Sequence, residues 1–137
     1  MASRLNPYIS FAGTAKQAME FYKDVFGGSL TLNTFGDSGA PDMPNPEQIM
    51  HAMLETDSGY TIMASDIPPG MPHTPGQTIT VSLSGDDGDE LRRYWEKLSA
   101  GGTVSMPLEK QMWGDEFGAC ADQFGINWMV NISQAPA

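Results

Sequence analysis

The chain has 137 residues, 40% apolar and 18% charged, a composition typical of one folded domain and not of a disordered segment. A net charge of −10 with seven lysines and arginines argues against nucleic acid as a partner, because phosphate binding needs clustered cations. No apolar run reaches the ~20 residues of a membrane span or resembles a signal peptide, and a single cysteine cannot form an internal disulfide. We therefore expect a cytoplasmic protein that contacts no membrane.

The first half of the chain predicts a strand, a helix and three further strands. Residues 7–12 alternate as a strand does. The helix that follows has Thr14 as its expected N-cap, an apolar stripe, and Gly27-Gly28 at its end. The later strands are expected at 30–35, 49–56 and 60–65.

Two segments rich in glycine and proline are expected to lack regular structure. Residues 36–48 form a long loop that either covers the mouth of a pocket or is a surface excursion. Residues 67–76 carry four prolines and join the two halves.

The second half repeats the order of the first. A strand, a helix and three strands are expected at 78–84, 89–100, 103–112, 116–121 and 126–132. Aligning the turn glycines Gly59 and Gly125 places Met63 on Met129. The expected fold is therefore α+β, with two βαβββ modules forming paired curved mixed sheets in a single domain over 1–137. Module one spans about 5–67, the linker about 68–76, and module two about 77–133.

Residue parity sorts each strand into a helix-facing side and an opposite side. Apolar residues expected to face the helices include Ile9, Phe11, Ile79, Val81, Leu83, Ile126, Trp128, Val130 and Ile132. The opposite side is either solvated or a cavity of moderate polarity, and a strongly curved sheet favours the cavity. The ligand-binding residues expected there are Asn6, Tyr8, Ser10, Met63, Ser65, Thr78, Thr80, Trp113, Phe117 and Met129. Trp113 and Phe117 could equally pack a dimer interface.

Several stretches together resemble the vicinal oxygen chelate superfamily, which includes glyoxalase I, bleomycin-resistance proteins and extradiol dioxygenases. The local sequence is most similar to that of its PhnB-like branch. The stretches are Pro7-Tyr8-Ile9-Ser10-Phe11, Ala18-Met19-Glu20-Phe21-Tyr22-Lys23-Asp24-Val25-Phe26-Gly27-Gly28, Met50-His51-Ala52-Met53-Leu54, Met63-Ala64-Ser65-Asp66, 102–108, 112–118 and 122–130. The resemblance implies the two-module fold, a cavity between modules and a homodimer.

In metal-using members of the superfamily, four His or Glu ligands come from the first and last strands of each module. The resemblance carries these positions to Asn6, Met63, Thr78 and Met129, which offer neither imidazole nor carboxylate. We therefore expect no metal and no cofactor.

His51 leaves two functional hypotheses open. If His51 has only a structural role, the expected function is that of a metal-free protein that binds a small organic molecule. If His51 is an acid–base group, the expected function is that of an isomerase- or lyase-type enzyme. A scaffold without ligand is a third possibility. His73 in the linker is expected to be solvated, and Cys120 to be a small buried thiol. The carboxylates from Asp86 to Glu90 are expected to cap the second helix.

Overall fold

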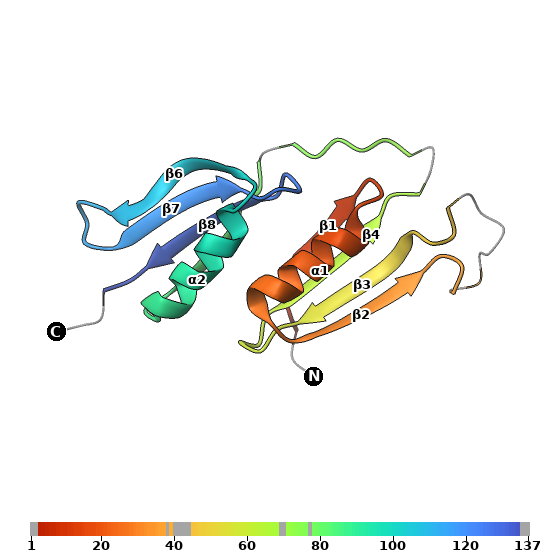
Figure 1. Ribbon diagram of the computed structural model, residues 1–137, viewed down its shortest axis with the longest axis horizontal. Helices are drawn as coiled ribbons and strands as arrows, with labels where there is room; N and C mark the ends of the chain where they lie inside the picture. Colours follow the sequence, from red (N-terminus) through yellow and green to blue (C-terminus); the bar gives the residue numbers. More distant parts are fainter. Residues whose placement is uncertain (1–2, 38, 40–44, 69–70, 77, 135–137) are drawn as a thin grey trace. The chain divides into compact units, whose positions relative to one another are not determined.

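The structure is a computed structural model that describes residues 3–37, 39, 45–68, 71–76 and 78–134. The chain falls into two compact units, Met1–Pro75 and Gly76–Ala137, each with a four-stranded mixed sheet and a helix against it (Figure 1). The predicted α+β class and the βαβββ order of both halves are confirmed. None of the described helices has the length and apolar character needed to cross a membrane.

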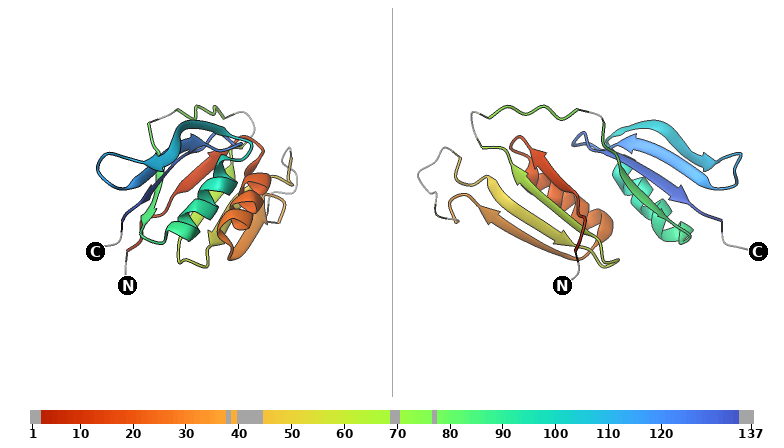
Figure 2. Two further views of the ribbon diagram at one scale, coloured as in Figure 1. Left: turned by 60° about the vertical axis from the view of Figure 1, so that its left-hand side comes forward. Right: turned by 180° about the vertical axis from the view of Figure 1, so that it is seen from behind.

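The first unit has its helix on one face of the sheet only. Its elements are β1 (Tyr8–Phe11), α1 (Ala15–Phe26), β2 (Ser29–Thr34), β3 (Ile49–Glu55) and β4 (Thr61–Asp66). The strand order is β1-β4-β3-β2, with β1 parallel to β4 and the other neighbours antiparallel. Seen from behind, the strands of this unit lie in front of α1, and the face that they show carries no helix (Figure 2).

The core of the first unit lies between the apolar side of α1 and the face of the sheet that the helix covers. One side of α1 is buried along its whole length, and alternate residues of β3 and β4 are buried beneath it. The largest fully buried side chains are Tyr22, Met19, Ile49 and Leu54. Burying each side chain of this size contributes about 2 kcal/mol, so the helix and the sheet depend on each other for stability.

The second unit repeats this arrangement. Its elements are β5 (Val81–Gly85), α2 (Gly88–Ser99), β6 (Thr103–Lys110), β7 (Glu116–Ala121) and β8 (Asn127–Ile132), in the sheet order β5-β8-β7-β6. Along β8, Trp128, Val130 and Ile132 are buried while the residues between them are not, which confirms the predicted alternation. Leu91, Tyr94 and Leu98 of α2 supply the other half of the core.

The first strand of the second unit is shorter than predicted. It begins at Val81, so Thr78 and Thr80 precede it, and Ile79 is 82% exposed instead of facing the helix. The reason lies in its pairing partner. β5 pairs in parallel with β8, starting from Val81 opposite Trp128, and β8 itself begins one residue earlier, directly after a turn. Residues 78–80 therefore have too little of β8 to pair with.

The two helices begin in different ways. At α1, Thr14 occupies the predicted N-cap position, but its hydroxyl makes no capping hydrogen bond. The buried carboxylate of Asp66 instead accepts the backbone N–H groups of Gly13 (3.0 Å) and Ala15 (2.9 Å). At α2 the predicted local capping is confirmed, because the side chain of Asp87 accepts the N–H of Glu90 at 3.1 Å.

The glycine pair after each helix has a role beyond ending it. A Cβ atom on Gly28 would lie 2.1 Å from the carbonyl oxygen of Glu55, and one on Gly102 would lie 2.1 Å from that of Ala121. Each of these carbonyls belongs to the strand end that leads into the last hairpin of its unit. The second glycine of each pair thus lets the chain pass directly against the sheet.

Candidate functional site

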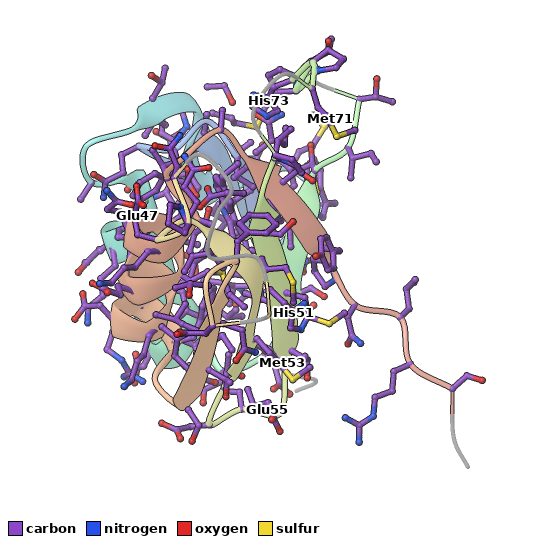
Figure 3. All side chains as sticks on the ribbon, turned by 90° about the vertical axis from the view of Figure 1, so that its right-hand side faces the viewer. Glu47, His51, Met53, Glu55, Met71 and His73 are labelled. Atoms are coloured by element: carbon purple, nitrogen blue, oxygen red, sulfur yellow. The ribbon has the colours of Figure 1, made fainter. Side chains whose placement is uncertain are left out.

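The side of the first sheet away from α1 is called here the open face of unit 1. It carries most of the ligand-binding residues that were predicted in this unit, namely Tyr8, Ser10, Met63 and Ser65. Tyr8 lies beside Met63, Met63 beside Met53, and Met53 beside Thr31, so one row crosses all four strands. Neighbours in register project to the same side of a sheet. Figure 3 shows His51, Met53 and Glu55 following one another along β3 on the side away from the helix.

Tyr8 and His51 form an aromatic pair on this face. Their ring centroids are 6.0 Å apart with the planes tilted by 35°, and Tyr8 remains 51% exposed while His51 is half-buried. The exposed phenol ring offers a flat apolar surface with a hydroxyl at its tip. The imidazole beside it can donate or accept a proton, so the pair can contact a ring and a polar group of one ligand.

Met53 and Met63 form the apolar floor of the same face. They lie directly opposite each other on neighbouring antiparallel strands, and both are half-buried. Thioether side chains adapt their shape to irregular ligands. The row beyond them is polar, with Ser10 beside Ser65 and His51 beside Asn33. The open face of unit 1 therefore joins an apolar floor to a polar rim that includes the imidazole of His51 and the carboxylate of Glu55, an arrangement suited to a small organic molecule.

The open face of unit 2, the side of its sheet away from α2, is built in the same way. Ser82 lies beside Met129 and Met129 beside Ala119, while in the next row Asn131 lies beside Phe117. The half-buried Phe117 and the exposed Trp113 pack edge to face, with ring centroids 6.4 Å apart.

The remaining predicted residues lie outside these rows. Asn6 is half-buried and precedes β1, and the exposed Thr78 and Thr80 precede β5. Met129 is therefore flanked by Ser82, not by Thr78. Asn6 and Thr78 thus both lie in the segment that leads into the first strand of their unit.

Other open-face residues were missed by sequence reasoning. Thr31 and Asn33 follow from strand parity alone, which would have identified them. Asp115 lies just before β7 and accepts a hydrogen bond of 3.1 Å from the side-chain amide of Asn131. No sequence signal marks that contact, because a turn residue has no fixed side.

The open faces do not fit the metal site of the metal-using relatives. The residues that β1, β4, β5 and β8 place there are Tyr8, Ser10, Thr61, Met63, Ser65, Ser82, Ser84, Asn127, Met129 and Asn131. Within these described strands that side carries no imidazole or carboxylate, the groups that Zn²⁺, Mn²⁺ or Ni²⁺ prefer. Among all described residues, no three His, Cys, Asp or Glu side chains gather closely enough to hold a metal ion.

Two carboxylates and one thiol lie in the core of the units instead of on the open faces. Asp66 and Asp122 are 2% and 4% exposed and accept backbone N–H groups from nearby loops and, for Asp66, from the first residue of α1. Cys120 is 3% exposed, and burial raises the pKa of its thiol to about 11. The prediction of a small buried thiol is confirmed, and a thiol of this kind is a poor nucleophile.

A further hollow of about 370 Å³ lies at the start of α1. Its lining residues are Gly13, Lys16, Gln17, Glu20, Glu47, Gln48, Ile49 and Asp66. The lining belongs to the helix and to the strand ends that meet it, so this hollow is separate from the open face. It contains none of the residues predicted for ligand binding.

Comparison with known proteins gives the chain a family and close relatives. The model of the Glyoxalase/Bleomycin resistance protein/Dioxygenase superfamily matches residues 4–130. Protein YjdN of Escherichia coli is 31% identical, over 93% of this chain and 94% of its own length. The crystal structure of protein PA1353 from Pseudomonas aeruginosa is 36% identical, with a TM-score of 0.87 over 98% of this chain and 100% of that one.

A more distant solved structure shares the fold. It is described as a putative 3-demethylubiquinone-9 3-methyltransferase, PhnB protein, from Bacillus cereus. It is 21% identical with a TM-score of 0.69, over 96% of this chain and 100% of that one. The superfamily predicted from the sequence is thus confirmed, and a PhnB protein lies among the structural neighbours.

Proposed function

Because the chain belongs to the glyoxalase/bleomycin resistance/dioxygenase superfamily, we propose that it is a metal-free member that binds a small organic molecule against its open sheet faces. The observation that carries the proposal is the row Tyr8–Met63–Met53–Thr31, which places an exposed ring and two thioethers among polar groups. The mismatch between divalent metals and the open-face side chains of β1, β4, β5 and β8 supports the metal-free part. The cavity between modules and the homodimer stay predictions.

Ligand binding is tested on unit 1 with a matched pair of variants. A library of small aromatic acids, alcohols and amines is screened by ligand-observed NMR against the unaltered protein, Met63→Lys and Met71→Lys. Met63 lies at the centre of the open face, whereas Met71 is 61% exposed in the linker. We expect Met63→Lys to lose ligands that Met71→Lys retains, because a lysine places a hydrated charge on the apolar floor. Equal losses, or none, would contradict the proposal.

The metal-free part has a separate test. Thermal shift and isothermal titration with Ni²⁺, Mn²⁺ and Zn²⁺ should show no tight binding of one ion per chain. A stoichiometric site of sub-micromolar affinity would overturn this part of the proposal without touching ligand binding.

A second candidate function is an isomerase- or lyase-type reaction with His51 as the acid–base group. The observation that favours it is the contact with Tyr8, which places a half-buried imidazole next to the surface where a ligand would lie. Once a ligand that turns over is found, His51→Gln should abolish turnover while circular dichroism stays unchanged. The exposed His73 provides the control, since His73→Gln should keep full activity. Undiminished turnover in His51→Gln would exclude this candidate.

A further inference from the structure

Two aromatic rings stand at one end of the open face of unit 2. Trp113 is 60% exposed in the turn between β6 and β7, and its ring packs edge to face on that of Phe117. Phe117 points away from α2, because the next residue, Gly118, faces the Trp95 ring of that helix. An exposed aromatic pair of this kind offers both a ring face and a ring edge to a ligand.

Carboxylates flank the aromatic pair on the same face. Glu109 of β6 lies opposite Phe117 in the sheet register, so both side chains project to the same side. Asp115 is half-buried and held in place, since one of its oxygens accepts the side-chain amide of Asn131 at 3.1 Å. The other oxygen accepts the backbone N–H of Gln134 at 3.4 Å. These five residues, Glu109, Trp113, Asp115, Phe117 and Asn131, are called the aromatic patch.

The negative charge of the aromatic patch is not neutralised by a neighbouring side chain. In this unit Arg92 forms ion pairs with Glu116 and Asp89. Glu116 lies on the other side of β7, where it binds the guanidinium from α2 and raises the pKa of Arg92. The next strand residue, Lys110, lies opposite Glu116 and so projects to that side as well. Within the part of the chain that the structure describes, Asp115 and Glu109 have no cationic partner.

We propose that the aromatic patch is a recognition site for organic cations, with the positive group near Asp115 and the apolar body against Trp113 and Phe117. Aromatic faces attract cations through the quadrupole of the ring, and a nearby carboxylate adds to that attraction. The net charge of −10 favours the approach of a cation and disfavours that of an anion. The inference rests on the proposed function and specifies the charge of the ligand.

The test compares three probes that share a benzyl group and differ in charge. Benzyltrimethylammonium, benzyl alcohol and phenylmethanesulfonate are titrated into the full chain at low salt, and the backbone NMR shifts and the indole N–H signal of Trp113 are followed. We expect the cation to bind at least about ten-fold more tightly than the alcohol, with the largest shifts at residues 109–117 and 131. Its affinity should fall as salt is added, because exposed charges are screened.

Matched variants assign the effect to the patch. Asp115→Asn should weaken binding of the cation about ten-fold and leave the alcohol unaffected, since an amide keeps the shape and loses the charge. Asp86→Asn removes the same charge from an exposed position before α2 and should change the affinity less than two-fold. Trp113→Leu should weaken both probes.

The outcomes separate this inference from the proposed function. Equal affinity for the three probes, or an equal loss in Asp115→Asn and Asp86→Asn, overturns the inference. So does an absence of cation binding. If neutral or anionic molecules bind on the open faces while the cation shows no preference, the proposed function stands and only the inference fails.

Discussion

The Oδ1 atom of Asp66 accepts a hydrogen bond of 2.9 Å from the backbone N–H of Ala15, the first residue of α1. The same oxygen accepts the N–H of Gly13 at 3.0 Å, and Oδ2 accepts the N–H of Ile49 at 2.9 Å. One carboxylate at the end of β4 therefore fixes both the start of the helix and the start of β3. The contact spans 51 positions of sequence, so only the folded unit can form it.

Removing this carboxylate should destabilise the first unit strongly. Asp66→Ala leaves three N–H groups without their acceptor, and we expect a loss of about 3 kcal/mol or more in the free energy of unfolding. Asp66→Asn should cost less, because its amide oxygen can still accept at the helix start. Urea denaturation measures both, with the exposed Asp37→Ala as control. Similar midpoints for Asp66→Ala and Asp37→Ala would contradict the assigned role.

The close approach of the chain after each helix gives a second prediction. Gly102→Ala would place a Cβ 2.1 Å from the carbonyl oxygen of Ala121, so the backbone must shift, and we expect a cost above about 2 kcal/mol. Gly59 has a φ of +89° and open space around it, so Gly59→Ala should cost only about 1 kcal/mol of backbone strain. Thermal unfolding of both variants checks the order. A larger loss at Gly59 would show that conformation outweighs contact.

The thiol of Cys120 should react slowly in the folded protein. Because burial raises its pKa from 9.0 to about 11, the thiolate fraction at pH 8 falls about 100-fold relative to an ordinary thiol. Labelling with Ellman's reagent should therefore be slow in buffer and fast in denaturing urea. The pH dependence has a definite sign. The thiol is protonated more readily when folded, so its contribution to stability is present below pH 9 and is lost as the pH rises toward 11. Cys120→Ala should remove that loss.

A hydrogen bond between two buried side chains anchors the last hairpin of the second unit. Asp122 accepts the indole N–H of Trp128 at 2.9 Å, and both residues are almost fully buried. Trp128→Phe keeps most of the apolar contact but leaves the carboxylate without this donor, and we expect it to cost about 2 kcal/mol. Trp95→Phe, at a half-buried position of α2, provides the comparison. A double-mutant cycle with Asp122→Asn should give a coupling energy clearly different from zero.

Much of the fold followed from the sequence because each sheet has one covered face. In β8 the helix covers Trp128, Val130 and Ile132 and leaves the residues between them open, so the alternation is complete and readable. Alternation does not show where a partner strand begins, and for this reason the strand predicted from residue 78 starts only at Val81. The alternation of residues along a strand identifies the side of the sheet on which each side chain lies. Pairing with a neighbouring strand decides where the strand begins and ends.

The candidate site was predictable to the same extent. Tyr8, Ser10, Met63 and Ser65 were assigned to one side by parity, and the sheet register brings them together. Asp66 was beyond sequence reasoning, because its partners are distant and the repeat gave no indication of it. The alignment that places Met63 on Met129 places Asp66 on Ile132, an apolar residue.

Because module two has Ile132 where module one has Asp66, the two modules differ in the order in which their parts can form. The cap of α2 lies within its own segment, since Asp87 and Glu90 are three residues apart, so it is available before any strand has paired. The group that caps α1 is the carboxylate of Asp66 at the end of β4, so it is available only when the last strand of the unit is in place. The two modules share one order of elements but differ in how their helices begin, because α2 has its cap within its own segment and α1 obtains its cap only from β4.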